Sequence, residues 1–324
     1  MRVFEVTPAA RWIPTAAARL SAFLALTALA CGSAWAQFNL GGGQNYGVLF
    51  QGYSGNTLQI TNVTINGNVG VGNNGKMTDS GPSTINGRID FSAGNTNQFS
   101  NNNGSNVITG GVNYGVSGVT NALNWVNSLS QTLNGDAGTS VAINGIQTIN
   151  ASSGSVFSVN GQSVHVFDAS SFNNNGTSDV LTINGSSSDL VAINLGGLGN
   201  IQFHGGIVFT GGISADHVIF NIGGGNYSTY SGGYSLDIQN NGGVDGLAQG
   251  IFLDPNGAIS TDNSIIEGRL FGGDSHDFQF VSGGHINAPP APTPEPFTLG
   301  LGVAGIFMAF RRVSHARARR LPGA

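Results

Sequence analysis

The sequence predicts an all-β fold of the β-solenoid type, with one amphipathic α-helix packed against it. The first observation is composition: the 324-residue chain has 52 glycines and only 8% charged residues, a balance that favours short strands and tight turns. Hydrophobic residues still reach 40%, which is enough to build a folded core. The second observation is a recurring Ile-Asn-Gly unit, and the third is a single glycine-free stretch with helical spacing.

The repeated unit places a β-branched or small residue before Ile, Asn and Gly. Its four full copies are Thr64–Gly67, Thr84–Gly87, Ala142–Gly145 and Thr182–Gly185. Successive side chains of a strand alternate between two faces, so each Ile points inward and the flanking Thr and Asn point outward. The Asn-Gly pair then supplies the positive φ that ends the strand.

The spacing of these copies favours a solenoid. The isoleucines lie at 65, 85, 143 and 183, so the steps of 20, 58 and 40 residues fall near multiples of 20. Coils of about that length would bury Ile65, Ile85, Ile143 and Ile183 in one continuous core. The alternative is a sandwich or a set of hairpins, because Asn-Gly between strands is also a strong hairpin signal.

The outward Thr-x-Asn pairs are the most informative polar feature of this body. They are Thr64/Asn66, Thr84/Asn86, Thr148/Asn150 and Thr182/Asn184. If the coils stack these pairs, they form a ladder of hydroxyl and amide groups that can bind sugar or ordered water. The alternative is the ordinary polarity of strands that face solvent.

One helix is predicted over residues 119–134. Apolar residues recur there at helical spacing, and Asn134-Gly135 provides a stop. We expect Leu123, Val126 and Leu129 to pack on the β body and Asn121, Asn124 and Ser128 to face water. Ser117 or Thr120 is the expected N-terminal cap.

The N-terminus is typical of a secretory signal peptide over residues 1–36. Arg11 and Arg19 precede the apolar run 20–30, and Ala34 and Ala36 form a small-x-small cleavage site that places the mature start at Gln37. A membrane anchor is the alternative, but 11 apolar residues are too few to span a bilayer. Lipidation of Cys31, the only cysteine, is a further alternative. Without Cys31 the exported chain has no disulfide or thiolate metal site.

The C-terminal segment 288–324 combines a proline-rich spacer, a short apolar run at 297–310 and an arginine cluster that begins at Arg311 and Arg312. Fourteen helical residues reach about 21 Å, less than the roughly 30 Å of a bilayer core, which suits a transient membrane segment. Residues 294–324, which begin with Pro294, Glu295 and Pro296, resemble the PEP-CTERM sorting signal. The resemblance implies transient recognition by an exosortase, a membrane protease of Gram-negative bacteria that also make exopolysaccharide.

The body, residues 37–287, carries a second resemblance. Residues 250–258 and 264–273 look like the closing strands of the choice-of-anchor A domain, and 63–74 and the helix at 119–134 approximate its opening. The resemblance implies a β-solenoid on a bacterial surface. Asp254 departs from the family, which commonly has a small residue before that proline.

Charge excludes one class of partner. Residues 37–293 hold three basic and 14 acidic residues, a formal charge of −11, so nucleic acid is not an expected partner. Three polar clusters, at His204, at Asp216 and His217, and at 274–277, are expected to be surface turn residues. Residues 241–246 only weakly suggest a calcium-binding turn. No catalytic, cofactor-binding or metal-binding residue is predicted.

These observations together predict an exported structural or adhesive protein, not an enzyme, that is associated with exopolysaccharide. After processing, the protein would lie in the cell envelope or extracellular matrix of a Gram-negative bacterium. Two alternatives remain open: a polysaccharide-active enzyme on a β-helix fold, and an ice-binding protein.

Overall fold

The computed structural model describes residues 37–52, 55–222, 235–239, 247–255, 257–273 and 278–290. The predicted signal peptide at 1–36, the sorting segment at 294–324 with its membrane run 297–310, the turn at 241–246 and the cluster at 274–277 lie outside these residues. Within the described part of the chain, no helix combines the length and apolar character needed to cross a membrane.

The described strands form three sheets in which almost every pairing is parallel. Sheet 1 runs in the order β10 (Val112–Val116), β7 (Ile89–Ser92), β4 (Asn68–Val71), β1 (Tyr46–Phe50), β23 (Ile265–Gly272), β21 (Leu247–Asp254), β19 (Val218–Asn221), β16 (Val191–Asn194), β14 (Gln162–Asn173) and β11 (Thr139–Asn144). Joined to it are β13 (Ser155–Val159) and the row β25 (His285–Asn287), β3 (Thr64–Asn66), β6 (Thr84–Ile85) and β9 (Val107–Ile108).

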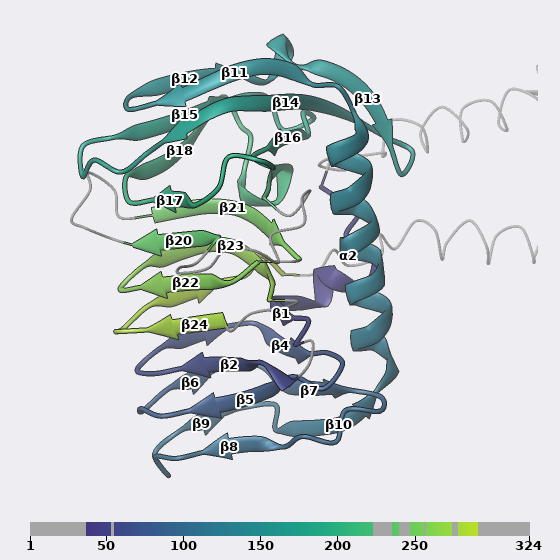
Figure 1. Ribbon diagram of the computed structural model, residues 1–324, viewed down its shortest axis with the longest axis vertical. Coiled ribbons are helices and arrows are strands. Elements are labelled where there is room, and N and C mark those ends of the chain that lie inside the picture. The colour runs from purple at the N-terminus through teal and green to yellow at the C-terminus, as the bar shows by residue number, and fades with distance from the viewer. Residues whose placement is uncertain are drawn as a thin grey trace, which may run out of the picture. The chain divides into compact units, whose positions relative to one another are not determined.

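The other two sheets complete the coils. Sheet 2 is β12 (Gln147–Asn150), β15 (Val180–Asn184) and β18 (Gly206–Thr210). Sheet 3 is β17 (Ile201–Phe203), β20 (Leu236–Gln239), β22 (Ile259–Asp262), β24 (Phe278–Val281), β2 (Thr57–Ile60), β5 (Lys76–Asp79) and β8 (Phe99–Asn101). The protein is therefore a β-solenoid with one flanking helix, as the sequence predicts (Figure 1).

The coils do not stack in chain order. The first coils run from β1 to β10, the helix follows, and β11 starts again at the opposite end of sheet 1. The later coils then approach the first one until β23 pairs with β1, where Val48 lies opposite Leu270. Strand β25 likewise pairs with β3, where Ile286 lies opposite Ile65. The first coil is thus enclosed between the second coil and the last one.

The core consists of inward-facing aliphatic and aromatic side chains from all three sheets. Ile65, Ile85, Ile143 and Ile183 are each at most 1% exposed and belong to one hydrophobic cluster, which confirms the predicted strand register. The hairpin alternative occurs once within the described residues: β13 pairs antiparallel with the start of β14 through Asn160 and Gly161, both at positive φ.

The Asn-Gly corners differ in their backbone conformation. Gly67 and Gly145 have positive φ as expected, whereas Gly87 and Gly185 do not. A Cβ atom on Gly87 would collide with the carbonyl oxygen of Gly67 in the neighbouring coil. Glycine is required at that corner by close backbone approach, and the predicted role of its φ angle is wrong there.

Helix α2 extends from Ser117 to Gly135 and lies along sheet 1 (Figure 1). Leu123, Val126 and Leu129 are buried, and Asn121, Asn124 and Ser128 are exposed, as predicted. The predicted cap is wrong: the N-cap residue is Val116 and makes no side-chain hydrogen bond. The helix starts directly after β10, so Ser117 falls inside its first turn. The described residues also contain three short 3-10 helices: η1 (Gly41–Asn45), η3 (Ala151–Ser153) and η4 (Ala215–His217).

Polar side chains from sheet 1 hold the C-terminal half of α2. Asn194 donates to the carbonyl oxygen of Leu133 at 2.7 Å, and Asn221 donates to that of Ser130 at 3.0 Å. Asn194 and Asn221 are neighbours on β16 and β19, and Asn221 also donates to Asn194 at 2.9 Å. The Leu133 carbonyl lies in the last turn, where the helix supplies no i+4 donor, and Asn194 fills that place, while Asn221 adds a second donor to the Ser130 carbonyl.

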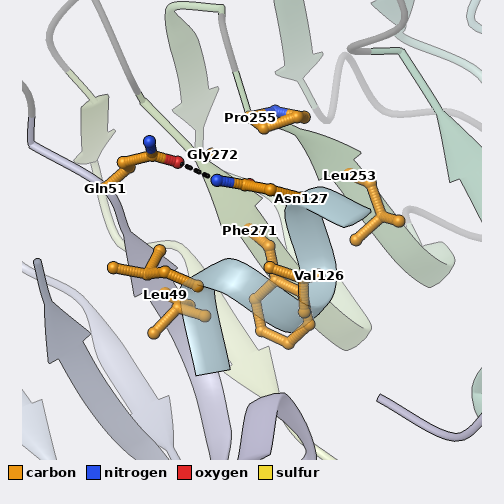
Figure 2. A pocket seen from close by; sticks show the side chains of 9 residues that line it. Leu49, Gln51, Val126, Asn127, Leu253, Pro255, Phe271 and Gly272 are labelled. Atoms are coloured by element: carbon orange, nitrogen blue, oxygen red, sulfur yellow. Dashed lines mark hydrogen bonds between the residues drawn. The ribbon is translucent and has the colours of Figure 1, made fainter. Parts of the chain in front are cut away.

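The middle of α2 packs tightly on the same sheet. Figure 2 shows Val126 beside Phe271, with Leu49 lining the same contact; nearby, Asn127 donates to Gln51 at 2.6 Å. The space left between helix and sheet is about 10 Å³, close to the smallest volume that holds one water molecule. This contact is a packing interface, and it offers no room for a ligand.

Candidate ligand-binding faces

The four Thr-x-Asn pairs stack in register, in two groups. In the first group, Thr64 lies opposite Thr84 on the neighbouring strands β3 and β6. In the second, Thr148 and Asn150 of β12 lie opposite Thr182 and Asn184 of β15. The structure therefore confirms a ladder of hydroxyl and amide groups, although not as one uninterrupted array.

The first ladder is a chain of hydrogen bonds between side chains of successive coils. Asn86 donates to Asn66 at 2.7 Å, Asn66 donates to Asn287 at 2.7 Å, and Asn287 donates to Glu267 at 2.6 Å. Every step runs in the same direction and ends on the carboxylate, which accepts hydrogen bonds only. The first ladder, residues 86, 66, 287 and 267, therefore carries its three amides in one orientation, from the residue that follows β6 across β3 and β25 to β23.

Beyond Thr64, the outward row that contains Thr84 and Thr64 continues without threonine. The positions that continue it on β25, β23 and β21 are His285, Ile265 and Leu247. Beside them, Gln249 donates to the carbonyl oxygen of Ile207 on β18 at 3.0 Å, which joins sheets 1 and 2. The two ladders thus lie on connected strands but are separated by a less polar segment.

The second ladder consists of Asn150, Asn184 and Thr210. Asn184 donates to the side chain of Asn150 at 3.0 Å, and the Thr210 hydroxyl donates to the side-chain oxygen Oδ1 of Asn184 at 3.1 Å. An open hollow of about 480 Å³ borders it, lined also by Ser152, Ser153, Ser186 and Asp189. Amide, hydroxyl and carboxylate groups therefore surround a space large enough for a small polar ligand.

Sheet 3 carries a second polar row that the sequence analysis missed. One outward residue from each of its seven strands stands in register: Gln202, Asp237, Ser260, Gln279, Gln59, Thr78 and Ser100. Several of these residues occupy the centre of apolar-polar-apolar triplets such as Leu58-Gln59-Ile60 and Phe278-Gln279-Phe280. Such a triplet indicates a strand with one outward polar residue. It does not indicate which strands lie side by side, because the strands of sheet 3 are far apart in the sequence.

Two of the predicted surface clusters differ from expectation. His217 is fully buried; its Nδ1 lies 2.6 Å from the Ser214 hydroxyl and its Nε2 lies 3.1 Å from the Ser187 carbonyl oxygen. It is a structural residue of the turn before β19, because its ring is committed to local contacts. His204 is half-buried and pairs with Asp237 at 3.1 Å, at the edge of the sheet 3 row.

Asp254, which departs from the family pattern, lies fully buried at the end of β21. The Ser235 hydroxyl donates to its Oδ2 at 2.5 Å, and its Oδ1 has no hydrogen-bond partner among the described residues. Burial raises the pKa of Asp254 from 3.8 to about 7, an effect that the Ser235 hydrogen bond partly offsets. The described residues contain no cluster of His, Cys, Asp or Glu suited to a metal ion.

Comparison with known proteins gave no matching family model and no matching curated protein. Solved structures similar to this chain include an ice-binding protein from an Arctic yeast, with a TM-score of 0.48, 14% identity and coverage of 82% of this chain and 99% of that one. Another is the ice-binding protein of the Antarctic ascomycete Antarctomyces psychrotrophicus, with a TM-score of 0.47, 15% identity and coverage of 80% and 100%. With identities this low and TM-scores below 0.5, these similarities establish no function for the chain.

Proposed function

We propose that this chain is an exported, non-enzymatic binding protein of the cell envelope or extracellular matrix, and that its hydroxyl and amide ladders bind exopolysaccharide. The observation that carries the proposal is the stacking of Thr-x-Asn pairs in neighbouring coils, with the amides ordered by the hydrogen bonds of the first ladder. Amides and hydroxyls are both donors and acceptors, so they match the hydroxyl groups of a sugar.

The spacing of the ladders suits a polymeric ligand. Neighbouring strands lie about 4.8 Å apart, so each coil presents its amide and hydroxyl at a regular step. Each contact is weak, but a long chain that engages many steps gains affinity because later contacts form at high effective concentration. The hollow beside Asn150 and Asn184 offers a place where one sugar unit can enter more deeply.

Ice binding is a second candidate, favoured by the threonines that stack in adjacent coils, Thr64 with Thr84 and Thr148 with Thr182. A crystal surface requires a long regular array. Here His285, Ile265 and Leu247 interrupt the threonine row between the two ladders. A flexible polymer tolerates such an interruption, so polysaccharide binding is the better explanation of this surface.

The binding test uses the exported protein and the exopolysaccharide purified from the producing cells. We expect co-sedimentation that weakens when Asn150 and Asn184 are both replaced by alanine, and that is unchanged in the control Asn175→Ala, an exposed asparagine outside the ladders. No co-sedimentation would contradict the proposal. If new reducing or unsaturated sugar ends appear during the incubation, the protein is an enzyme. If the protein inhibits ice recrystallisation and the Thr84→Ala, Thr182→Ala double variant does not, the protein binds ice.

Export and sorting are the second part of the proposal. Cleavage after Ala36 would release the body outside the inner membrane, while residues 297–310 are retained by Arg311 and Arg312 on the cytoplasmic side. Replacing Pro294, Glu295 and Pro296 by alanine should leave export intact but keep the chain uncleaved in the membrane. Mass spectrometry of the exported protein decides this: mature chains that still carry Arg311 and Arg312 would exclude processing by an exosortase.

A further inference from the structure

A separate hollow lies on the outer side of α2, away from the ladders. Its volume is about 350 Å³, and it is lined by Trp125 together with Asn121, Asn124 and Ser128 of the helix and Asn160 of the β13–β14 turn. Trp125 is 38% exposed, so part of its indole ring is open to this hollow.

The indole of Trp125 is held in place on one side. Its Nε1 donates to the carbonyl oxygen of Asn39 at 3.0 Å. Gly41 lies directly against the ring, since a Cβ atom built on Gly41 would come within 2.6 Å of the ring atoms Cγ and Cδ2. Gly41 also has a φ of +52°, so a larger residue would be disfavoured there twice over. The ring therefore has a fixed orientation.

Hydrogen bonds connect the elements that line the hollow. Gln162, two residues after Asn160, donates to the carbonyl oxygen of Gln37 at 2.6 Å and accepts from the backbone N–H of Asn39 at 2.8 Å. The segment 37–39 thus connects the β13–β14 turn to the tryptophan of α2. A hollow assembled from three connected elements is preformed, which lowers the entropic cost of binding a ligand.

The polar groups that line the hollow are uncommitted. The side chains of Asn121, Asn124, Ser128 and Asn160 make no hydrogen bond to any other described residue, and no lining residue is charged. An aromatic face with amides and a hydroxyl beside it matches a pyranose ring, whose C–H bonds stack on the negative face of the indole while its hydroxyls bind the amides.

We propose that Trp125, Asn121, Asn124, Ser128 and Asn160 form a binding site for a neutral pyranose unit of a carbohydrate. This site shares no residue with the two ladders, so its binding does not depend on theirs. Its lack of charged groups favours uncharged hexoses over uronic acids or sulfated sugars.

The test is a calorimetric titration of the exported protein with neutral cello-, malto- and manno-oligosaccharides. Tryptophan fluorescence provides a second signal, because Trp12 and Trp35 precede the expected cleavage site and leave Trp125 as the reporter. We expect saturable binding to at least one series with a change in Trp125 emission. Trp125→Ala should weaken it about tenfold or more, as the loss of one stacking contact does elsewhere, and Trp125→Phe should weaken it less.

Matched variants separate this site from a folding effect and from the ladders. Asn121→Ala and Asn124→Ala replace exposed helix residues by the best helix former, so together they should weaken binding while leaving the melting temperature unchanged or raised. Tyr114→Ala, at another exposed aromatic residue, and the Asn150→Ala, Asn184→Ala ladder variant should bind these oligosaccharides normally. Absence of binding at millimolar concentrations, or binding unaffected by the Asn121, Asn124 double variant, would overturn the proposal.

Discussion

The side-chain amide of Asn86 donates a hydrogen bond of 2.7 Å to the side-chain carbonyl of Asn66, its counterpart one coil away and 20 residues earlier. Asn66 in turn donates to Asn287 in the neighbouring coil on its other side. In the sequence, Asn287 lies 221 residues after Asn66. One row of amides therefore joins the second coil, the first coil and the last coil. The row that we propose as part of the ligand-binding surface also connects the first coil with the last described one.

Removing the middle amide should therefore weaken the structure modestly. Asn66→Ala leaves the Asn86 donor and the Asn287 acceptor without their partners, and we expect a loss of about 0.5–1.5 kcal/mol in the free energy of unfolding, because water replaces part of each bond at this exposed position. Chemical denaturation measures it, with Asn175→Ala as the control. An equal loss in both variants would show that the ladder adds nothing to stability.

The alternation of faces on β6 makes a sharper prediction. Ile85 is 1% exposed and lies in the main core, whereas its neighbour Thr84 is half-buried on the outward side. Ile85→Ala should cost about 2–5 kcal/mol through lost burial and the cavity that remains, while Thr84→Ala should cost far less. Comparable losses, measured by denaturation of both variants, would contradict this assignment of inward and outward residues.

The sequence predicted these faces because the alternation of side chains is a local property of a strand. It did not predict the stacking order, because contacts such as that between Val48 and Leu270 join segments more than 200 residues apart. Ile143 illustrates the difference. Its burial was predicted. However, its strand β11 pairs with β14 at the end of sheet 1 and does not lie beside the repeat copy at 182–185, whose Thr182 lies opposite Thr148 of β12.

The candidate sites also differ in whether the sequence could predict them. Thr-x-Asn pairs could be recognised because the two residues of each pair are only two positions apart in the sequence, and stacking then follows if coils are aligned. The sheet 3 row depends on seven strands contributing one residue each, and the Trp125 site depends on Asn39 and Asn160, which are distant from the helix in sequence. Neither has a motif of its own.

Docking of α2 on sheet 1 can be tested with a buried charge. Val126 is 3% exposed and lines the helix–sheet contact with Leu49 and Phe271 (Figure 2), so Val126→Asp buries a carboxylate at a place where the lining residues include no basic side chain. We expect a marked fall in the melting temperature. Asn124→Asp, which adds the same charge on the exposed side of the same helix, should change it little. An unchanged melting temperature in Val126→Asp would exclude the observed packing of the helix.

The buried carboxyl of Asp254 predicts how stability depends on pH. Its pKa is raised to about 7 in the folded protein by burial, against an ordinary value of 3.8, so the folded state keeps a proton that the unfolded chain releases between these two values. The stabilising contribution of the protonated carboxyl is therefore complete below about pH 4, is lost as the pH rises towards 7, and changes no further above that.

Asp254→Asn isolates this contribution from the other carboxylates of the acidic body, because asparagine has a similar size and does not ionise. We expect the free energy of unfolding of the variant, relative to the unaltered protein, to increase steadily from pH 4 to pH 7 and to level off by pH 8. Urea denaturation across that range measures the difference. A difference that is constant with pH would show that Asp254 is ionised in the folded protein throughout, and that the polar groups around it, beginning with the Ser235 hydroxyl, stabilise its charge.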